Sequence, residues 1–401
     1  SESILNQISE KNVPEVNFYR MYFLFPQWRY KEAIKFLKKS LRIKKISNYQ
    51  KLVYKINLAS CYLFINDTVS SAKLLQKLFY QLKESPNYLL FGNVIELMLQ
   101  LAVLEKDLSR AKSLIDYYQA EHSGLEKKYG LFIDKWKGIV KLIGDQENGL
   151  KELKKVQKLS LSLNEYEISR DIDFYRALYT DNVNLMNKLY IGTPYHQYRK
   201  SLIRRTSKKI KIGGSQVIDL KTNKVITNIS RGLILDLKDF FYGSSRINFT
   251  DKQKIGLSVV FEDLYKPIHI GSFFSSVFEG EWFNPFSSLN RVSQLIFRIN
   301  RTLKAHDVDL RLRLKDNRII YHCESSVLIK IHLKKIDVRS SEENFRKASS
   351  YFQKKTFTSN DLTRVINCSS RKAQYLIKGW ISSQKIHKMG VGKNIRYCFF
   401  K

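Results

Sequence analysis

The stretch NRVSQLIFRINRTL, residues 290–303, decides how the middle of this chain is interpreted. Its polar residues recur at helical spacing and share one face: Arg291, Gln294, Arg298 and Arg301. Its apolar residues share the other face: Val292, Leu295, Ile296, Ile299 and Leu303. Such a helix suits the major groove of DNA, and it equally suits an ordinary solvated surface. The surrounding sequence has to distinguish these two interpretations.

Strong positive charge is the first relevant feature of that surrounding sequence. The 401 residues include 70 Lys and Arg against 37 Asp and Glu, a formal net charge of +33. A field of this sign attracts polyanions, either nucleic acid or an acidic membrane surface. The alternative is that basic proteins are general in the source proteome. The length predicts two to four domains, and the scarcity of proline and glycine predicts mostly helical structure.

Cysteine usage and hydropathy predict a soluble, cytoplasmic protein without membrane contact. The four cysteines are widely spaced and form no CxxC pair, which fits reduced thiols: Cys61, Cys323, Cys368 and Cys398. Residues 1–15 carry acidic side chains and lack the apolar core of a signal peptide. The most apolar long window, residues 88–104, is interrupted by Asn93, Glu96 and Gln100, so it falls short of a membrane span.

The first half of the chain repeats itself. YKEAIKFLKKSL from Tyr30, SSAKLLQKLF from Ser70 and SRAKSLIDYY from Ser109 are similar. Their small residues, Ala33, Ala72 and Ala111, are spaced by 39 both times, and looser copies surround Gly149 and Leu185. A polar break with an aspartate precedes each later copy: Asp67, Asp107, Asp145 and Asp181. Units of helix, turn and helix at this period predict an α-solenoid.

The repeat resembles tetratricopeptide (TPR) repeats, with Ala33, Ala72 and Ala111 at the small position of the second helix. Its period is longer, and the full Trp/Leu-Gly/Tyr/Pro signature is lacking. The resemblance implies a TPR-like domain over residues 1–200 that binds a protein or peptide partner on its concave face or senses a ligand. An architectural role, or formation of a homodimer, is the alternative.

A basic linker is predicted over residues 201–214. No acidic residue occurs between Asp181 and Asp219, whereas eight Lys and Arg do, and the segment ends in Gly213-Gly214. Such a linker could follow a phosphate backbone. A solvated helix end followed by a loop explains the same composition.

The middle of the chain predicts the element order of a winged helix-turn-helix. QVIDL and KVITNI predict a hairpin around Thr222-Asn223, and Thr250 caps the helix that follows. A short aromatic helix at residues 268–278, the residues 290–303 helix and a hairpin around Asp316-Asn317 complete the order. No acid occurs between Glu281 and Asp307, which favours contact with DNA over a plain solvated helix.

This region resembles the DNA-binding domain of OmpR-like response regulators. The recognition-helix pattern of that family is matched at six positions and in the wing: Val292, Ile296, Arg298, Ile299, Arg301, Leu303 and Tyr321. Leu295 replaces the usual His, KDN replaces the wing glycines, and a helical repeat stands where a receiver domain would be expected. The resemblance implies a winged-helix domain over residues 215–338, without regulation by aspartyl phosphorylation.

The DNA contacts predicted in this domain lie on the helix and on the wing. Base-edge contacts are expected from the first turns: Ser287, Ser288, Asn290, Arg291 and Gln294. Arg298 is expected at phosphate, while Arg301 lies too far along the helix to read sequence. The wing contributes basic residues: Arg311, Arg313, Lys315 and Arg318.

A second winged helix is predicted over residues 345–401, which hold 13 Lys and Arg and one acid, Asp361. TSNDLTRVI and SSRKAQYLIKGWISSQK resemble the helices of the generic bacterial winged helix. The predicted contacts are Ser369, Ser370, Arg371, Lys372, Gln374, Lys378, Lys393, Asn394 and Arg396. Residues expected to pack inward are Val365, Ala373, Leu376, Ile377 and Trp380. Protein binding is the alternative role for this module.

These patterns predict a mainly α chain with α+β winged-helix domains: an N-terminal TPR-like α-solenoid, then two winged helix-turn-helix domains. The expected function is a DNA-binding transcriptional regulator acting on double-stranded DNA. No catalytic motif, cofactor motif or metal-ligand spacing is found, and GVGKN at residues 390–394 is no Walker A loop. A protein-interaction scaffold, or an accessory subunit of a nucleic-acid-processing complex, is the alternative.

Overall fold

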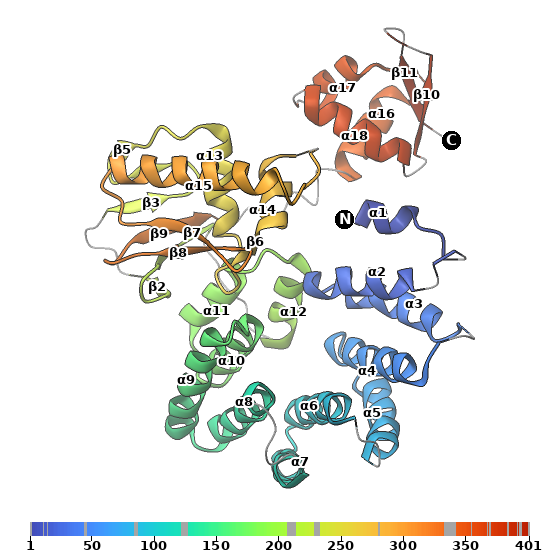
Figure 1. The fold of residues 1–401 in the computed structure, drawn as a ribbon, viewed down its shortest axis with the longest axis vertical. Helices are drawn as coiled ribbons and strands as arrows, with labels where there is room; N and C mark the ends of the chain where they lie inside the picture. Colours follow the sequence, from blue (N-terminus) through green and yellow to red (C-terminus); the bar gives the residue numbers. More distant parts are fainter. Residues whose placement is uncertain are drawn as a thin grey trace.

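The structure is a computed structural model of the chain. It describes residues 2–10, 12–13, 15–43, 46–83, 87–121, 127–206, 214–227, 233–279, 281–332, 342–353, 355–366, 368, 370–382, 385–390, 392 and 395–399. The N-terminal half is α-helical, and the C-terminal half combines helices with small sheets (Figure 1). The coarse prediction of a mainly α chain followed by α+β structure is confirmed.

The helical array comprises the N-terminal helices, and each helix from α1 to α11 packs on its neighbours in sequence. Its elements are α1 (Glu2–Gln7), α2 (Val16–Leu24), the 3-10 turn η1 (Phe25–Gln27), α3 (Tyr30–Ser40), α4 (Asn48–Phe64), α5 (Thr68–Lys83), α6 (Tyr88–Leu104), α7 (Leu108–Glu121), α8 (Lys127–Gly144), α9 (Gln146–Ser162), α10 (Tyr166–Tyr179), α11 (Val183–Ile191) and α12 (His196–Thr206). Helices α4, α6, α8 and α10 also contact one another in that order, so they form one layer of the array. The units of helix, turn and helix that follow one another in the sequence are therefore stacked in space.

A recurring turn separates the stacked helices. Asp67, Asp107 and Asp145 each accept a hydrogen bond from the backbone N–H three residues later, at 3.1, 3.0 and 3.2 Å. The aspartates at the predicted breaks therefore act as helix N-caps, which satisfy a free donor of the first turn. The fourth break differs, because Asn182 is the cap and Asp181 has a positive φ of 52°.

The small residues of the repeat lie four positions after the N-cap residue, which in the first copy is Arg29 without a side-chain capping bond. Ala33, Ser71 and Ala111 are fully buried there. A Cβ at the equivalent Gly149 would lie 2.3 Å from the Leu142 Cα, so only glycine fits this helix crossing. The prediction of Ala72 at this position was wrong by one residue, since Ala72 is only partly buried. The Ser71 hydroxyl is satisfied by donating to the Ala59 carbonyl at 3.0 Å, which lets a polar residue take the small position.

The helical array closes on itself through its last helix. In Figure 1, α12 lies between α11 and α2, and it contacts η1. The rings of Trp28, directly after η1, and Tyr198, in α12, meet edge to face with centroids 4.6 Å apart. The Arg205 guanidinium lies 4.1 Å from the ring centroid of Phe174 in α10. The hollow side of the array, expected to be open to partners, is therefore partly filled by the chain itself. Helix α12 also continues into residues 201–206, where the linker was predicted, while residues 207–213 lie outside the described part of the chain.

The sheet region follows, over residues 215–332. Its strands are β1 (Ser215–Asp219), β2 (Lys224–Ile226), β3 (Ile234–Asp236), β4 (Phe241–Tyr242), β5 (Ser245–Arg246), β6 (Ile268–His269), β7 (Arg311–Lys315), β8 (Arg318–His322) and β9 (Leu328–His332). Its helices are α13 (Asp251–Val260), α14 (Ile270–Val277) and α15 (Ser288–Ala305). Strands pair in the orders β2-β1-β9-β3-β4-β5 and β6-β8-β7. Both predicted hairpins, β1–β2 and β7–β8, are confirmed. Strands β3, β4, β5, β6 and β9 were not predicted. Strands β3 to β6 are only two or three residues long, and β6 occupies residues 268–269, where the aromatic helix was predicted to begin.

The helical array and the sheet region share one hydrophobic core, which runs from Ile56 to Ile331. Helix α11 contacts β1 and β2. The Leu264 backbone N–H donates to the Gly192 carbonyl at 3.0 Å, and a Cβ on Gly192 would lie 2.8 Å from the Leu264 side chain. The two parts are therefore packed together rather than joined only through a linker.

The C-terminal region has a hydrophobic core of its own. Its elements are α16 (Glu342–Phe352), α17 (Ser359–Ile366), α18 (Ser370–Ser382), β10 (Ile386–Met389) and β11 (Arg396–Phe399). The predicted inward residues Ala373, Leu376, Ile377 and Trp380 are buried, and Val365 is partly buried. A bridge between Phe357 and Tyr397 precedes α17, so the order of helix, extended bridge, two helices and hairpin matches that of α13 to β8.

Candidate nucleic-acid interface

Helix α15 is held firmly against the sheet region. Val292, Ile299 and Leu303 are fully buried on its inner face. The Asn300 amide donates to the Leu312 carbonyl and its oxygen accepts from the Leu312 N–H, both at 2.8 Å, which fixes the helix to β7. A helix clamped in this way presents a fixed outer face, because its rotation about its own axis is prevented.

The outer face of α15 is polar and exposed over several turns. Asn290, Gln294 and Arg298, three of the predicted contacts, are exposed along it. Arg301 is also exposed, and the Phe297 ring lies on the same side with 67% of its surface accessible. The structure therefore brings together the central predicted contacts.

Arg291 is not on this free face. Its guanidinium donates to both carboxylate oxygens of Glu281, at 2.5 and 3.2 Å. It also lies 4.3 Å from the ring centroid of Phe278, at the end of α14. Arg291 thus ties α15 to the connection from α14, a structural contact that the spacing of the helix did not reveal.

The two predicted serines at the start of α15 differ in exposure. Ser287 is exposed at the N-cap position and makes no side-chain capping bond. Ser288 is only 2% exposed, and its hydroxyl accepts a hydrogen bond from the Asn284 backbone N–H at 2.9 Å. Ser288 therefore shapes the turn before the helix and does not reach the surface.

The predicted wing residues also fall into two groups. Arg311, Arg313 and Lys315 are exposed on β7, on the side opposite the buried Leu312. Arg318 of β8 instead donates to the Pro267 carbonyl at 3.1 Å, and its guanidinium lies 5.8 Å from the ring centroid of Tyr166 in α10. Arg318 therefore faces the helical array, and three basic residues remain for an external ligand.

The C-terminal region exposes a smaller set of the predicted contacts. Ser370, Gln374 and Lys378 are exposed on α18, and Arg396 is exposed on β11. Arg371 and Lys372 belong to the first turn of α18, but their side chains are outside the description. Ser369, Lys393 and Asn394 lie outside the described residues.

A groove of about 860 Å³ between the helical array and the sheet region was not predicted. Its basic lining residues come from both parts: Lys154, Lys158, Arg176, Lys188, Lys221, Lys224 and Lys266. Its carboxylates are already engaged, because Asp173 accepts from Lys188 at 3.1 Å and from the Tyr265 hydroxyl at 2.9 Å. No local pattern could have indicated this groove, since it forms where segments distant in sequence meet.

Within the described part of the chain, no cluster of three or more His, Cys, Asp or Glu side chains could hold a metal ion. None of the described helices combines the length and apolar composition needed to cross a bilayer. No model of a known protein family matches this chain, and no curated protein matches it either.

Proposed function

We propose that the chain is a cytoplasmic, DNA-binding transcriptional regulator. In this proposal residues 215–338 form an OmpR-like winged helix-turn-helix domain, in which α15 enters the major groove and the β7–β8 wing contacts the phosphate backbone. The observation that carries the proposal is a clamped helix with Asn290, Gln294 and Arg298 exposed, followed directly by a hairpin with three exposed basic residues.

The dimensions and chemistry of α15 support this assignment. Its 18 residues span about 27 Å at 1.5 Å per residue, and an α-helix fits the major groove, which is about 12 Å wide. Amide side chains such as Gln294 pair with adenine, and Arg298 suits guanine or phosphate. The surplus of basic residues adds an affinity that depends steeply on salt.

The other two parts of the chain have supporting roles in the proposal. The C-terminal winged helix, residues 345–401, would extend the DNA contact through Gln374, Lys378 and Arg396, or bind protein instead. The TPR-like domain, residues 1–200, would sense a partner or ligand or mediate a homodimer. Because α12 fills part of its hollow side, the groove shared with the sheet region is the favoured place for such a partner.

The test is DNA binding measured at several salt concentrations. Wild-type protein is expected to bind duplex DNA at low salt, and Arg298→Ala with Arg313→Ala is expected to weaken binding. The control, Lys73→Ala with Lys77→Ala, removes the same charge from exposed positions of α5. Absence of DNA binding by the wild type at low salt would refute the proposal. Sequencing of DNA that co-purifies with the protein would identify its sites.

A second candidate function is a protein-interaction scaffold or an accessory subunit of a nucleic-acid-processing complex. Trp282 and Phe286, in the connection between α14 and α15, are 75% and 95% exposed. Exposed aromatic rings in a structured turn are typical of protein-binding surfaces. Co-purifying proteins that survive nuclease treatment, and that are lost in Trp282→Ala with Phe286→Ala, would favour this candidate.

A further inference from the structure

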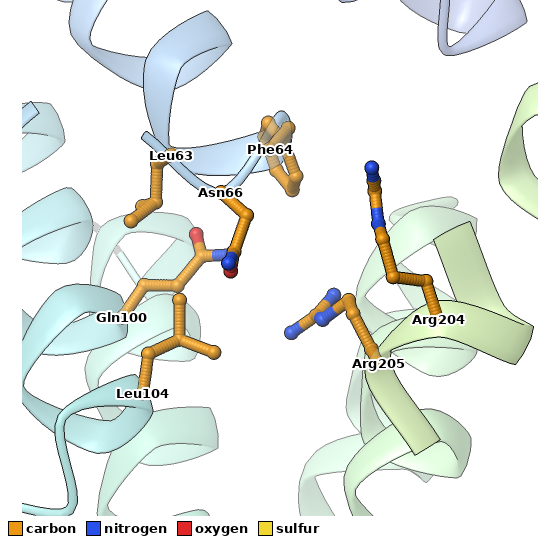
Figure 2. A pocket seen from close by; sticks show the side chains of 7 residues that line it. All are labelled: Leu63, Phe64, Asn66, Gln100, Leu104, Arg204 and Arg205. Carbon is orange, nitrogen blue, oxygen red and sulfur yellow. The ribbon is translucent and has the colours of Figure 1, made fainter. Parts of the chain in front are cut away.

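A small pocket lies where the helical array closes on itself. It has a volume of about 70 Å³ and lies between α4, α6 and α12 (Figure 2). Its lining residues are Leu63, Phe64, Asn66, Gln100, Leu104, Arg204 and Arg205. The pocket is distinct from the proposed DNA-binding face, because none of its residues belongs to the sheet region.

Two arginines from the last turn of α12 supply its positive charge. Figure 2 shows Arg205 extending toward the side of the pocket formed by Asn66 and Gln100, while Arg204 runs upward along the opposite side. Among the described residues, no carboxylate forms an ion pair with either guanidinium. Arg205 is positioned by the Phe174 ring, 4.1 Å from its guanidinium carbon.

Nearby carboxylates are paired with other cations. Asp171 pairs with Lys135 at 3.0 Å, and Glu167 pairs with Arg170 at 3.4 Å. Both arginines at the pocket carry a positive charge, since an arginine is always protonated in a protein.

A buried amide faces these arginines. Gln100 is only 8% exposed, yet its side chain has no hydrogen-bond partner among the described residues. Figure 2 shows it directed into the pocket beside Asn66. The polar atoms of Gln100 are not among the fully buried atoms that lack a partner, which fits an amide that opens onto the pocket. Guanidinium groups only donate, so they cannot satisfy one another or the amide N–H. An acceptor with several oxygens would satisfy both kinds of donor.

We propose that this pocket binds the phosphate group of a small ligand, either inorganic phosphate or a phosphate monoester. Paired guanidinium groups match the oxygens of phosphate, and amide N–H groups add neutral donors. A volume of about 70 Å³ holds roughly two to five water molecules, which suits the five heavy atoms of one phosphate but not a base or a sugar. The rest of a monoester would extend toward the exposed Arg204.

The proposed ligand would connect the two ends of the helical array. Arg204 and Arg205 belong to α12, whereas Gln100 belongs to α6 and Asn66 follows α4. A phosphate held by both sides bridges these helices, so it stabilises the closed form. Helix α12 is also the last element before the sheet region, so closure by the ligand would fix the connection between the two parts.

The test is thermal unfolding of the full chain in inorganic phosphate, compared with chloride at equal ionic strength. The wild type is expected to gain about 2 °C or more in its unfolding midpoint at saturating phosphate. Arg204→Gln, an exposed position that leaves the core intact, is expected to lose most of that gain. The control, Lys73→Gln at an exposed position of α5, lowers the net charge equally and is expected to retain it.

A second variant gives an independent test if Arg204→Gln disturbs folding. Gln100→Glu places a carboxylate opposite the two arginines, so it is expected to raise the midpoint without phosphate and to abolish the phosphate-dependent gain. Glycerol phosphate in place of inorganic phosphate distinguishes the sources: a larger gain with it supports a monoester ligand, and an equal or smaller gain supports free phosphate. An equal phosphate effect in the wild type, Arg204→Gln and Gln100→Glu, or no effect in the wild type, would overturn the proposal. Neither result depends on DNA binding.

Discussion

Arg170 in α10 donates from Nη2 to both carboxylate oxygens of Asp263, at 2.7 Å each, and joins the helical array to the connection after α13. Burial alone would lower the pKa of Arg170, but the Asp263 and Glu167 carboxylates, with smaller contributions from Tyr198 and the hydrogen bond to Asp263, together raise it. Asp263 also accepts the backbone N–H groups of Tyr265 and Lys266, at 3.0 and 3.1 Å. The array and the sheet region are thus held by a buried ion pair as well as by their shared core.

Asp263→Ala is expected to destabilise the chain by about 3–5 kcal/mol, because it leaves the buried Arg170 guanidinium with only the more distant, partly exposed Glu167 as an acidic partner. Chemical denaturation of the full chain measures this change. The control is Glu147→Ala, which breaks an exposed pair with Lys151 at 2.7 Å and should cost about 1 kcal/mol or less. Equal effects of the two variants would contradict the structural role given to the Arg170–Asp263 pair.

Gly149→Ala is expected to destabilise the helical array by at least about 1–3 kcal/mol. The added methyl would lie 2.3 Å from the Leu142 Cα and backbone nitrogen, so α8 and α9 would have to separate. Gly144→Ala is the matched control, since a Cβ there meets nothing within 4 Å. Thermal unfolding followed by circular dichroism compares the two, and a stable Gly149→Ala protein would show that the crossing is looser than described.

Residues on α15 are expected to affect DNA binding in different ways. Gln294→Ala should cost about 1–3 kcal/mol on the preferred sequence and little on random DNA, because an amide reads a base edge. Arg298→Ala should weaken binding to both the preferred sequence and random DNA. If Arg298 contacts phosphate, the slope of log K against log salt concentration should also fall by about 1. Fluorescence anisotropy with selected and random duplexes measures these effects.

Arg291→Ala provides a contrast within the same helix. Because Arg291 is bound to Glu281 and lies over Phe278, its loss should lower the stability of the sheet region. At temperatures where the variant is folded, its sequence preference should match that of the wild type. A relaxed sequence preference in folded Arg291→Ala would instead assign it a base contact.

Asp361 is expected to make α17 sensitive to acid. The Thr358 backbone N–H and hydroxyl both donate to the Asp361 carboxylate at 2.8 Å, and these bonds lower the pKa of Asp361. The folded pKa is below the unfolded value of about 3.9, so the stabilisation is complete above about pH 4 and is lost as the pH falls through the folded value.

Asp361→Ala should therefore lower the free energy of opening of α17 by about 0.5–2 kcal/mol at neutral pH. The difference between the variant and the wild type should become smaller in acid. Hydrogen exchange of α17, corrected for intrinsic rates, measures this between roughly pH 3 and 7. Asn360→Ala, at the exposed neighbouring position, is the control. A difference that is constant over this pH range would rule out the Asp361 carboxylate as its cause.

The local parts of the structure could be predicted from the sequence, because they depend on neighbouring residues. Helical periodicity identified α15, and the polar turns at Thr222-Asn223 and Asp316-Asn317 identified the two hairpins. Asp67, Asp107 and Asp145 marked helix starts because aspartate caps a first turn locally. The predicted position of the small repeat residue was off by one at Ser71, because the Ala59 carbonyl accepts the hydrogen bond of its buried hydroxyl.

Contacts between distant segments could not be predicted in this way. Arg318 looked like a free wing residue, yet its position beside Tyr166 depends on how β8 packs against the helical array. The helical spacing of Arg291 placed it on the polar face of α15, but its side chain is hydrogen-bonded to Glu281 in the preceding connection. The groove and the pocket arise in the same way, from surfaces that meet only after the chain has folded.

The edge-to-face contact of Trp28 with Tyr198 changes how the helical array is expected to unfold. A linear stack of repeats has two ends, and its terminal units fray independently because each contacts only one neighbour. Here α12, the last helix, contacts η1 and Trp28 near the start of the array, so neither of these units can open without disturbing the other. The array should consequently lose its structure in one cooperative step rather than unit by unit from its ends.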